Sequence, residues 1–124
     1  NRLLQFTTAA DAYTVNLPYA TGSGDVYEFL NAIIKTSGSI IINATHPGTS
    51  TNKFVGTVVN YSASTVSTVT FSSTTNDIIT LNITTTGAAK AGDYLKLQDV
   101  AATVWRVVDF RVFSSGNPAT PFSG

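Results

Sequence analysis

The stretch that decides the fold is Gly92–Phe113, GDYLKLQDVAATVWRVVDFRVF, which predicts two β-strands joined by a turn. In the first strand Leu95 and Leu97 alternate with polar neighbours, and the turn falls within Asp99–Thr103. The second strand is rich in β-branched and aromatic residues, which suit a pleated, half-buried surface. It carries the only tryptophan, Trp105, and so large an apolar ring predicts that the core closes over it.

The composition of the whole chain also favours strands. The 124 residues make one domain's worth of sequence. Charged residues are only 11% of the chain, less than half of the usual share of about 25%, and threonine, serine and asparagine take their place. Helices favour glutamate on their surfaces, yet Glu28 is the only one, whereas threonine suits strands.

Charge and hydropathy exclude several classes of function. The net charge is +0 and no basic cluster is present, which argues against binding to nucleic acid. No apolar run approaches the roughly 20 residues of a membrane helix. Cysteine is absent, so stability must come from packing and strand pairing, with oligomerisation as an open further source.

Segments with strand character recur about every 10 residues, which predicts a single-domain antiparallel β-sandwich or β-barrel of about eight strands with no substantial helix. Asp25–Lys35 is the one segment compatible with a helix, and its β-formers and flanking glycines favour a strand. Besides the hairpin, the predicted strands are Tyr13–Leu17, Asp25–Lys35, Ser39–Ala44, Lys53–Tyr61, Ser64–Ser72 and Asp77–Thr84.

The two ends of the chain differ from the middle. Residues 1–8 form either an N-terminal arm or a first strand, residues 9–114 the β-domain, and residues 115–124 a tail rich in proline, glycine and serine. Chain ends are usually disordered unless they are tied down. Apolar residues at both ends, in a chain of low charge, therefore suggest arms that pack on another subunit.

The catalytic inventory is thin, and we expect no enzyme, no metal and no cofactor. His46, the only histidine, lies beside Pro47-Gly48 with no acidic neighbour to orient it. With one histidine and no cysteine, the usual zinc arrangements are excluded. Asp109 and Arg111 are spaced for a surface ion pair. A glycosidase needs two carboxylates across a cleft, and the candidates here are Asp25, Glu28, Asp77, Asp93, Asp99 and Asp109. Most of these residues lie at the edges of predicted turns, where aspartate usually binds its own backbone.

Two interpretations of the surface stay open at this point. A low-charge, threonine-rich β surface is a poor shield against edge-to-edge association, so either other subunits cover it or it is the skin of a plain extracellular domain. Aromatic side chains either stack on sugar rings or fill the core and interfaces, the second being favoured; these are Tyr13, Tyr19, Tyr27, Tyr61, Tyr94 and Trp105.

Three segments together resemble small structural proteins of tailed bacteriophages, particularly marine ones. The segments are NLPYATGSGDVYEF (16–29), NDIITLNITTTGAAKAGDYLKLQDVAATVWRVVDF (76–110) and NPATPFS (117–123). The class has an LPAATGTG-x-x-Y-x-F start, an ITLNGTTTGG-x-x-GD middle, a W-x-V strand and an ATPFS ending. Ile83 stands where the class often has glycine, and Ala88 where a second glycine is common.

The resemblance implies a virion component: a capsid decoration (cement) protein that binds the outer capsid surface, or else a head or tail fibre module that binds host glycans. Such proteins are usually β-rich and commonly trimeric, which makes the major capsid protein and other copies of the chain the expected partners, with neither nucleic acid nor membrane. The expected contact residues lie near the two ends: Arg2, Leu3, Leu4, Phe6, Pro118, Pro121 and Phe122.

Overall fold

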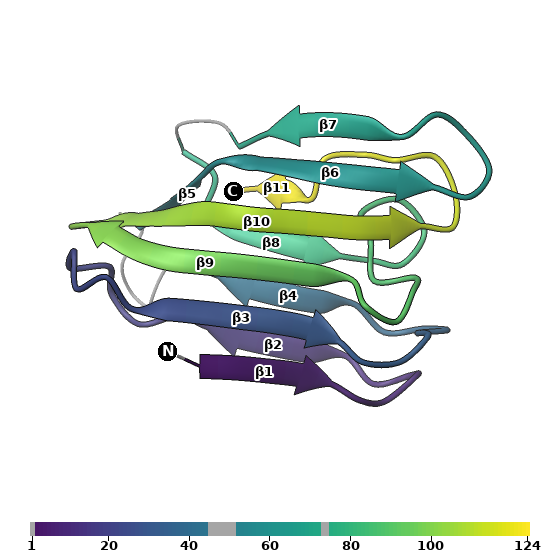
Figure 1. Ribbon diagram of the computed structural model, residues 1–124, viewed down its shortest axis with the longest axis horizontal. Coiled ribbons are helices and arrows are strands. Elements are labelled where there is room, and N and C mark those ends of the chain that lie inside the picture. Colours follow the sequence, from purple (N-terminus) through teal and green to yellow (C-terminus); the bar gives the residue numbers. More distant parts are fainter. Residues whose placement is uncertain (1, 45–51, 73–74) are drawn as a thin grey trace.

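The chain folds into two β-sheets that lie in two layers (Figure 1). The computed structural model describes residues 2–44, 52–72 and 75–124, and these contain eleven strands and no helix. The prediction of an all-β chain is confirmed. The prediction of about eight antiparallel strands is wrong in two respects, because the described residues form more strands and four of the strand pairs are parallel.

The larger sheet has seven strands in the order β1-β3-β9-β10-β6-β7, with β5 also paired to β10. Parallel pairing joins β1 to β3, and both β5 and β6 to β10. The strands are β1 (Arg2–Phe6), β3 (Val26–Asn31), β5 (Lys53–Val55), β6 (Thr57–Ser62), β7 (Thr68–Phe71), β9 (Tyr94–Ala101) and β10 (Val104–Ser114).

The smaller sheet lies behind the larger one in Figure 1 and has the order β11-β8-β4-β2. Its β2 and β4 are parallel, and the other two pairs are antiparallel. The strands are β2 (Tyr13–Asn16), β4 (Ile40–Asn43), β8 (Ile78–Leu81) and β11 (Phe122–Ser123). In the described part of the chain both sheets remain open, since no pairing joins the outer strands of either one.

The hairpin predicted from the sequence forms the centre of the larger sheet. Strand β9 continues through Asp99 to Ala101, so the turn is shorter than predicted and bends at Thr103, which has a φ of 66°. The side chain of Trp105 is fully buried, and its ring meets that of Tyr27 edge-on with 5.5 Å between the centroids. The core therefore does close over the tryptophan.

Alternation along β10 fills the space between the layers. Trp105 and Val107 point inward, and a register shift between Val107 and Asp109 then resets the alternation so that Phe110 and Val112 also point inward. Ile40, Ile42 and Ile79 of the smaller sheet belong to the same buried cluster. Each such aliphatic side chain contributes about 1.5–3 kcal/mol when fully buried.

A glycine divides the strand that the sequence predicts as Lys53–Tyr61. Gly56 has a φ of 150°, and a Cβ there would lie 2.5 Å from the Cβ of Val107. Only glycine allows the chain to pass β10 so closely, so the segment becomes β5 and β6, both of which pair with β10.

Both ends of the described chain lie within the sheets. Strand β1 occupies most of residues 1–8 and pairs with β3 along its whole length, and Phe6 packs against Tyr13 with 4.9 Å between ring centroids. In residues 115–124, strand β11 pairs with β8, and Phe122 packs edge-on against Phe110. Asp25–Lys35, the segment that was compatible with a helix, contains strand β3 as predicted.

Candidate interaction surfaces

A groove opens where the two layers end, between edge strands β1 and β2. It has a volume of about 840 Å³. We call it the β1–β2 groove, and it is lined by Arg2, Leu3, Leu4, Val15, Asn16, Leu17, Pro18 and Tyr27. The two walls come from different sheets, and neither edge is covered by a further strand among the described residues.

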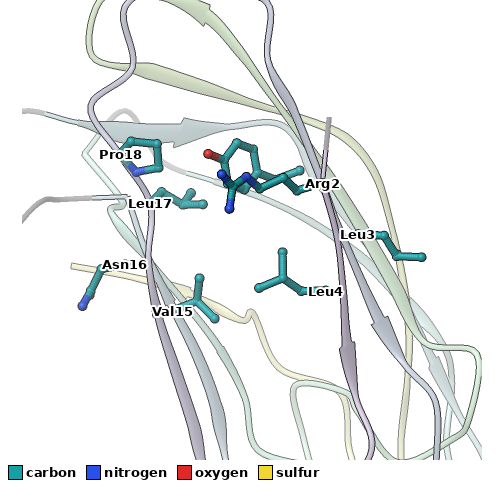
Figure 2. A pocket seen from close by; sticks show the side chains of 8 residues that line it. Arg2, Leu3, Leu4, Val15, Asn16, Leu17 and Pro18 are labelled. Atoms are coloured by element: carbon teal, nitrogen blue, oxygen red, sulfur yellow. The ribbon is translucent and has the colours of Figure 1, made fainter.

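The side chains on the two walls are mainly apolar and face one another. In Figure 2, Leu4 points from β1 into the space, Val15 and Leu17 point into it from the opposite wall, and Leu3 points away. Leu17 is almost fully buried, whereas Leu4 and Val15 are half-buried. The groove thus exposes parts of Leu4 and Val15, and covering this apolar surface with a partner would be energetically favourable.

Arg2 is the one charged side chain that lines the groove. Figure 2 shows it reaching across the space toward Pro18. Within residues 2–44, 52–72 and 75–124, its guanidinium forms no hydrogen bond or ion pair, and the ion pair present in these residues joins Arg111 to Asp109 instead. A guanidinium with no protein partner is available to an external carboxylate.

A second apolar surface lies on the outside of the larger sheet, at the opposite edge. We call it the outer apolar face, formed by Tyr61, Val69, Phe71 and Phe113. The rings of Tyr61 and Phe113 stack with 5.2 Å between centroids, and Phe71 on edge strand β7 is 72% exposed. Residues 57–72 contain no charged side chain, although natural edge strands usually carry charge to prevent association.

Asp99 holds the loop 20–25 in place from strand β9. Its carboxylate accepts hydrogen bonds from the N–H of Gly22 at 2.6 Å, the N–H of Thr21 at 2.9 Å and the hydroxyl of Ser23 at 3.0 Å. Burial acts to raise the pKa of this carboxyl, but the donors from Thr21, Gly22 and Ser23 outweigh it and hold the pKa below its ordinary value.

Asp93 holds the loop 82–93 at the other end of β9. Its Oδ2 accepts the N–H of Ala88 at 2.8 Å and that of Phe113 at 3.0 Å. Burial raises the pKa of this carboxyl to about 6, even though the N–H donors oppose the shift. Asn31 completes the support, because its Nδ2 donates to the carbonyl of Lys90 at 2.9 Å.

The remaining candidates for chemistry lie apart. Glu28 accepts a hydrogen bond from the hydroxyl of Tyr94, and Asp109 forms the predicted ion pair with Arg111, Nε to Oδ1, at 3.0 Å on the surface. The described residues contain no group of three or more histidine, cysteine, aspartate or glutamate side chains that could hold a metal ion. His46 lies outside the described residues.

The structure places the seven expected contact residues in two kinds of position. Phe6, Pro121 and Phe122 are buried in the chain's own fold. Arg2 and Leu3 are exposed, and Leu4 and Pro118 are half-buried. Arg2, Leu3 and Leu4 lie together at the β1–β2 groove, whereas Pro118 belongs to the far end of the chain.

The aromatic residues divide between core and surface. Trp105 is buried, and Tyr13 and Tyr27 are half-buried against the core. Tyr19 and Tyr61 are 43% and 39% exposed. Sequence reasoning did not find the groove or the outer apolar face. The groove lies between strands of two different sheets, and the outer apolar face depends on the pairing of β10 with β6, neither of which the local sequence records.

Comparisons with protein-family models, with curated proteins and with solved structures found no match for this chain. In the described part of the chain, no helix is long and apolar enough to cross a membrane.

Proposed function

We propose that this chain is a structural protein of a tailed-bacteriophage virion, a decoration protein that binds the outer capsid surface and stabilises the shell. In this proposal the two layers act as a β-sandwich scaffold, and the chain performs no reaction. The observation that carries the proposal is the pair of uncovered apolar surfaces at opposite edges of the fold, the β1–β2 groove and the outer apolar face. The resemblance of residues 16–29, 76–110 and 117–123 to phage structural proteins supports the same role.

The physical basis is burial of these surfaces in the assembled particle. The two surfaces expose apolar side chains whose burial against a partner is favourable, and exposed apolar surface is typical of interaction sites. Edge strands β1, β2 and β7 can also accept a partner strand through their backbone groups. A protein that binds the intact shell and not its separated subunits shifts the equilibrium toward the intact shell by mass action.

Two surfaces also fit the expected set of partners. One surface contacts the major capsid protein and the other contacts further copies of this chain, as a homotrimer would require. Neither nucleic acid nor a membrane is part of this proposal, since the chain has a net charge of +0.

The test is to mix the purified chain with phage shells that lack decoration proteins, and to measure co-sedimentation and the temperature at which the shells open. We expect saturable binding and a higher opening temperature. Phe71→Ser and Leu4→Ser change the two surfaces separately, and an exposed threonine variant, Thr57→Ser, serves as the matched control. Absence of binding to such shells under all conditions would contradict the proposal.

A second candidate function is a fibre module that binds host glycans. The observation that favours it is the exposure of Tyr19 and Tyr61, whose rings can stack on sugars. Binding to a glycan array that is lost in Tyr19→Ala or Tyr61→Ala, together with no affinity for shells, would support this function over decoration.

A further inference from the structure

We propose that the β1–β2 groove receives an extended segment of a different polypeptide, one with alternating apolar side chains and a carboxylate placed opposite Arg2. This inference rests on the proposed function, in which a virion protein supplies the segment. It reverses the role that the sequence suggested for the first residues, because the stretch from Arg2 to Phe6 becomes the receiving wall and is not an inserting arm.

The backbone of both walls is open to a further strand. Strand β1 pairs only with β3, and β2 only with β4, among the residues that the structure describes. The N–H and C=O groups along the free side of each strand therefore lack a strand partner. An extended peptide that pairs with such an edge gains main-chain hydrogen bonds, and its alternate side chains enter the adjoining pocket.

The lining of the groove defines which side chains fit. Leu4, Val15 and Leu17 converge from the two walls, and about 840 Å³ is within the usual range for a binding cleft. Alternate residues of a strand point to one side, so every second residue of the occupant would be apolar.

The charge of the groove defines the remaining feature of the occupant. The guanidinium of Arg2 has no ion-pair partner among the described residues, and guanidinium binds carboxylate through two parallel hydrogen bonds. An occupant with an aspartate or glutamate complements it, whereas a lysine at the same position would be repelled. A simple lipid chain would leave the open backbone edges unused.

A second copy of this chain fits less well as the occupant. Its described segments that combine an acidic residue with an apolar strand are Asp11–Leu17, Asp25–Leu30, Asp77–Leu81, Asp93–Ala101 and Val104–Phe113. The strands of the last four, β3, β8, β9 and β10, are already paired on two sides. Asp11–Leu17 contains β2, which is itself a wall of the groove and directs Val15 and Leu17 into the groove of its own molecule. The segment therefore comes from a different polypeptide.

The experiment titrates the isotope-labelled full chain with three acetylated, amidated hexapeptides in which valine and threonine alternate and one valine, on the face that enters the groove beside Arg2, is replaced by aspartate, asparagine or lysine. We expect the aspartate peptide to shift the amide signals of β1 and β2 and to bind about three- to fivefold more tightly than the asparagine peptide. Arg2→Gln should abolish this preference and Arg2→Lys should retain most of it. Phe71→Ser, on the outer apolar face, should change neither.

Four results would overturn the inference. These are the absence of localised shifts with every peptide, an aspartate preference that survives Arg2→Gln, changes at the same amides caused by raising the concentration of the chain alone, and tighter binding of decanoate than of the peptide. The third would assign the groove to a second copy and the fourth to a lipid.

Binding to shells separates this inference from the proposed function. If Arg2→Gln abolishes the peptide preference and also weakens shell binding, both proposals are supported. If the wild-type chain binds the aspartate peptide as expected but no shell, the decoration role fails and the groove assignment stands.

Discussion

The loops at the two ends of strand β9 are held by the same device and yet differ in their electrostatics. Asp99 receives the N–H groups of loop 20–25, and Asp93 receives those of loop 82–93. The two side chains are nearly equally buried, at 3% and 5% exposed. Even so, the pKa of Asp99 is lowered and that of Asp93 is raised to about 6.

The difference arises from what faces each carboxylate. Loop 20–25 directs two backbone N–H groups and a hydroxyl at Asp99, near the surface. Asp93 lies at the interior between the sheets, where it lines a small cavity together with the apolar side chains of Phe29, Leu95 and Val112. The comparison teaches that a small exposed area does not fix the charge state of a carboxyl, because the donors and the apolar groups around it decide the sign of the shift.

The same loops also differ in backbone strain. Loop 20–25 has glycine at both of its left-handed positions, Gly22 and Gly24, with φ of 84° and 83°. Loop 82–93 places Ile83 and Ala88 at φ of 77° and 73°. At both positions glycine would adopt this conformation without the steric cost that a side chain brings.

The largest expected effect is that of Asp99→Ala. It leaves the N–H groups of Thr21 and Gly22 without their acceptor and should lower the free energy of unfolding by about 3 kcal/mol at pH 7, measured by urea unfolding with circular dichroism. Asp109→Ala is the control and should cost less than about 1 kcal/mol, since its ion pair is exposed. Equal losses of unfolding free energy in the two variants would show that the hydrogen bonds to Asp99 stabilise the fold no more than an exposed ion pair does.

The pKa of Asp93 also predicts how the free energy of unfolding depends on pH between pH 4 and 6. Because the pKa of Asp93 in the folded chain is about 6 and the ordinary value is 3.8, the unfolded chain loses its proton first as the pH rises. The free energy of unfolding should therefore fall by on the order of 2–3 kcal/mol between pH 4 and 6 from this group. Asp99 acts in the opposite sense. Its lowered pKa stabilises the folded chain at neutral pH, and this stabilisation is lost as the pH falls through that pKa.

Asp93→Asn tests the assignment of this pH effect. The variant should flatten the profile between pH 4 and 6, because it removes the titrating group and keeps an acceptor oxygen for the N–H groups of Ala88 and Phe113. A wild-type profile that rises over this range, or one that Asp93→Asn leaves unchanged, would show that the burial of Asp93 does not control it.

A smaller effect is expected for Ile83→Gly. Relief of the left-handed strain, about 1–2 kcal/mol, should nearly offset the lost side-chain burial and the added freedom of the unfolded chain. We expect the free energy of unfolding to change by less than about 1 kcal/mol. Ile78→Gly is the matched control, a half-buried isoleucine in strand β8, and should cost about 2 kcal/mol more. A similar loss of unfolding free energy in both variants would show that the left-handed conformation of Ile83 is not strained.

A modest effect is also expected for Ser23→Ala, which removes one of the donors to Asp99. It should cost about 0.5–1.5 kcal/mol and should move the pKa of Asp99 upward, as followed by a carboxyl-carbon NMR titration. Ser115→Ala is the control, because its hydroxyl only reaches the carbonyl of Ile83 at 3.5 Å on the surface. An unchanged Asp99 titration in Ser23→Ala would contradict the role of this hydroxyl.

Local patterns predicted most of the strands. Alternation identified β2 and the β9–β10 hairpin, and the run Ile40–Ile42 identified β4. Strong β-formers identified β8 and outweighed the helical alternative at β3. The parallel pairs could not be predicted, because they join segments whose only common property is apolar alternation. The division at Gly56 depends on the close approach of Val107, a contact across 51 residues that no local signal records.

The candidate surfaces were less predictable than the fold. The sequence singled out Arg2, Leu3 and Leu4, but the opposite wall of the groove comes from Val15 and Leu17 in the other sheet. Asp93 lies at a turn edge, directly before β9, as the sequence predicts. Its hydrogen bond from the N–H of Phe113, and that of Asp99 from the N–H of Thr21, join residues distant in the chain and could not be predicted from local sequence.

Trp105 gives the molecule a built-in optical reporter. Its indole N–H donates to the carbonyl of Pro18, and its ring rests edge-on against Tyr27, so that two residues lining the β1–β2 groove touch the sole tryptophan of the chain. Any occupant that displaces Pro18 or Tyr27 should alter the emission of this indole, and filling of the groove can therefore be followed in unlabelled protein by ultraviolet fluorescence.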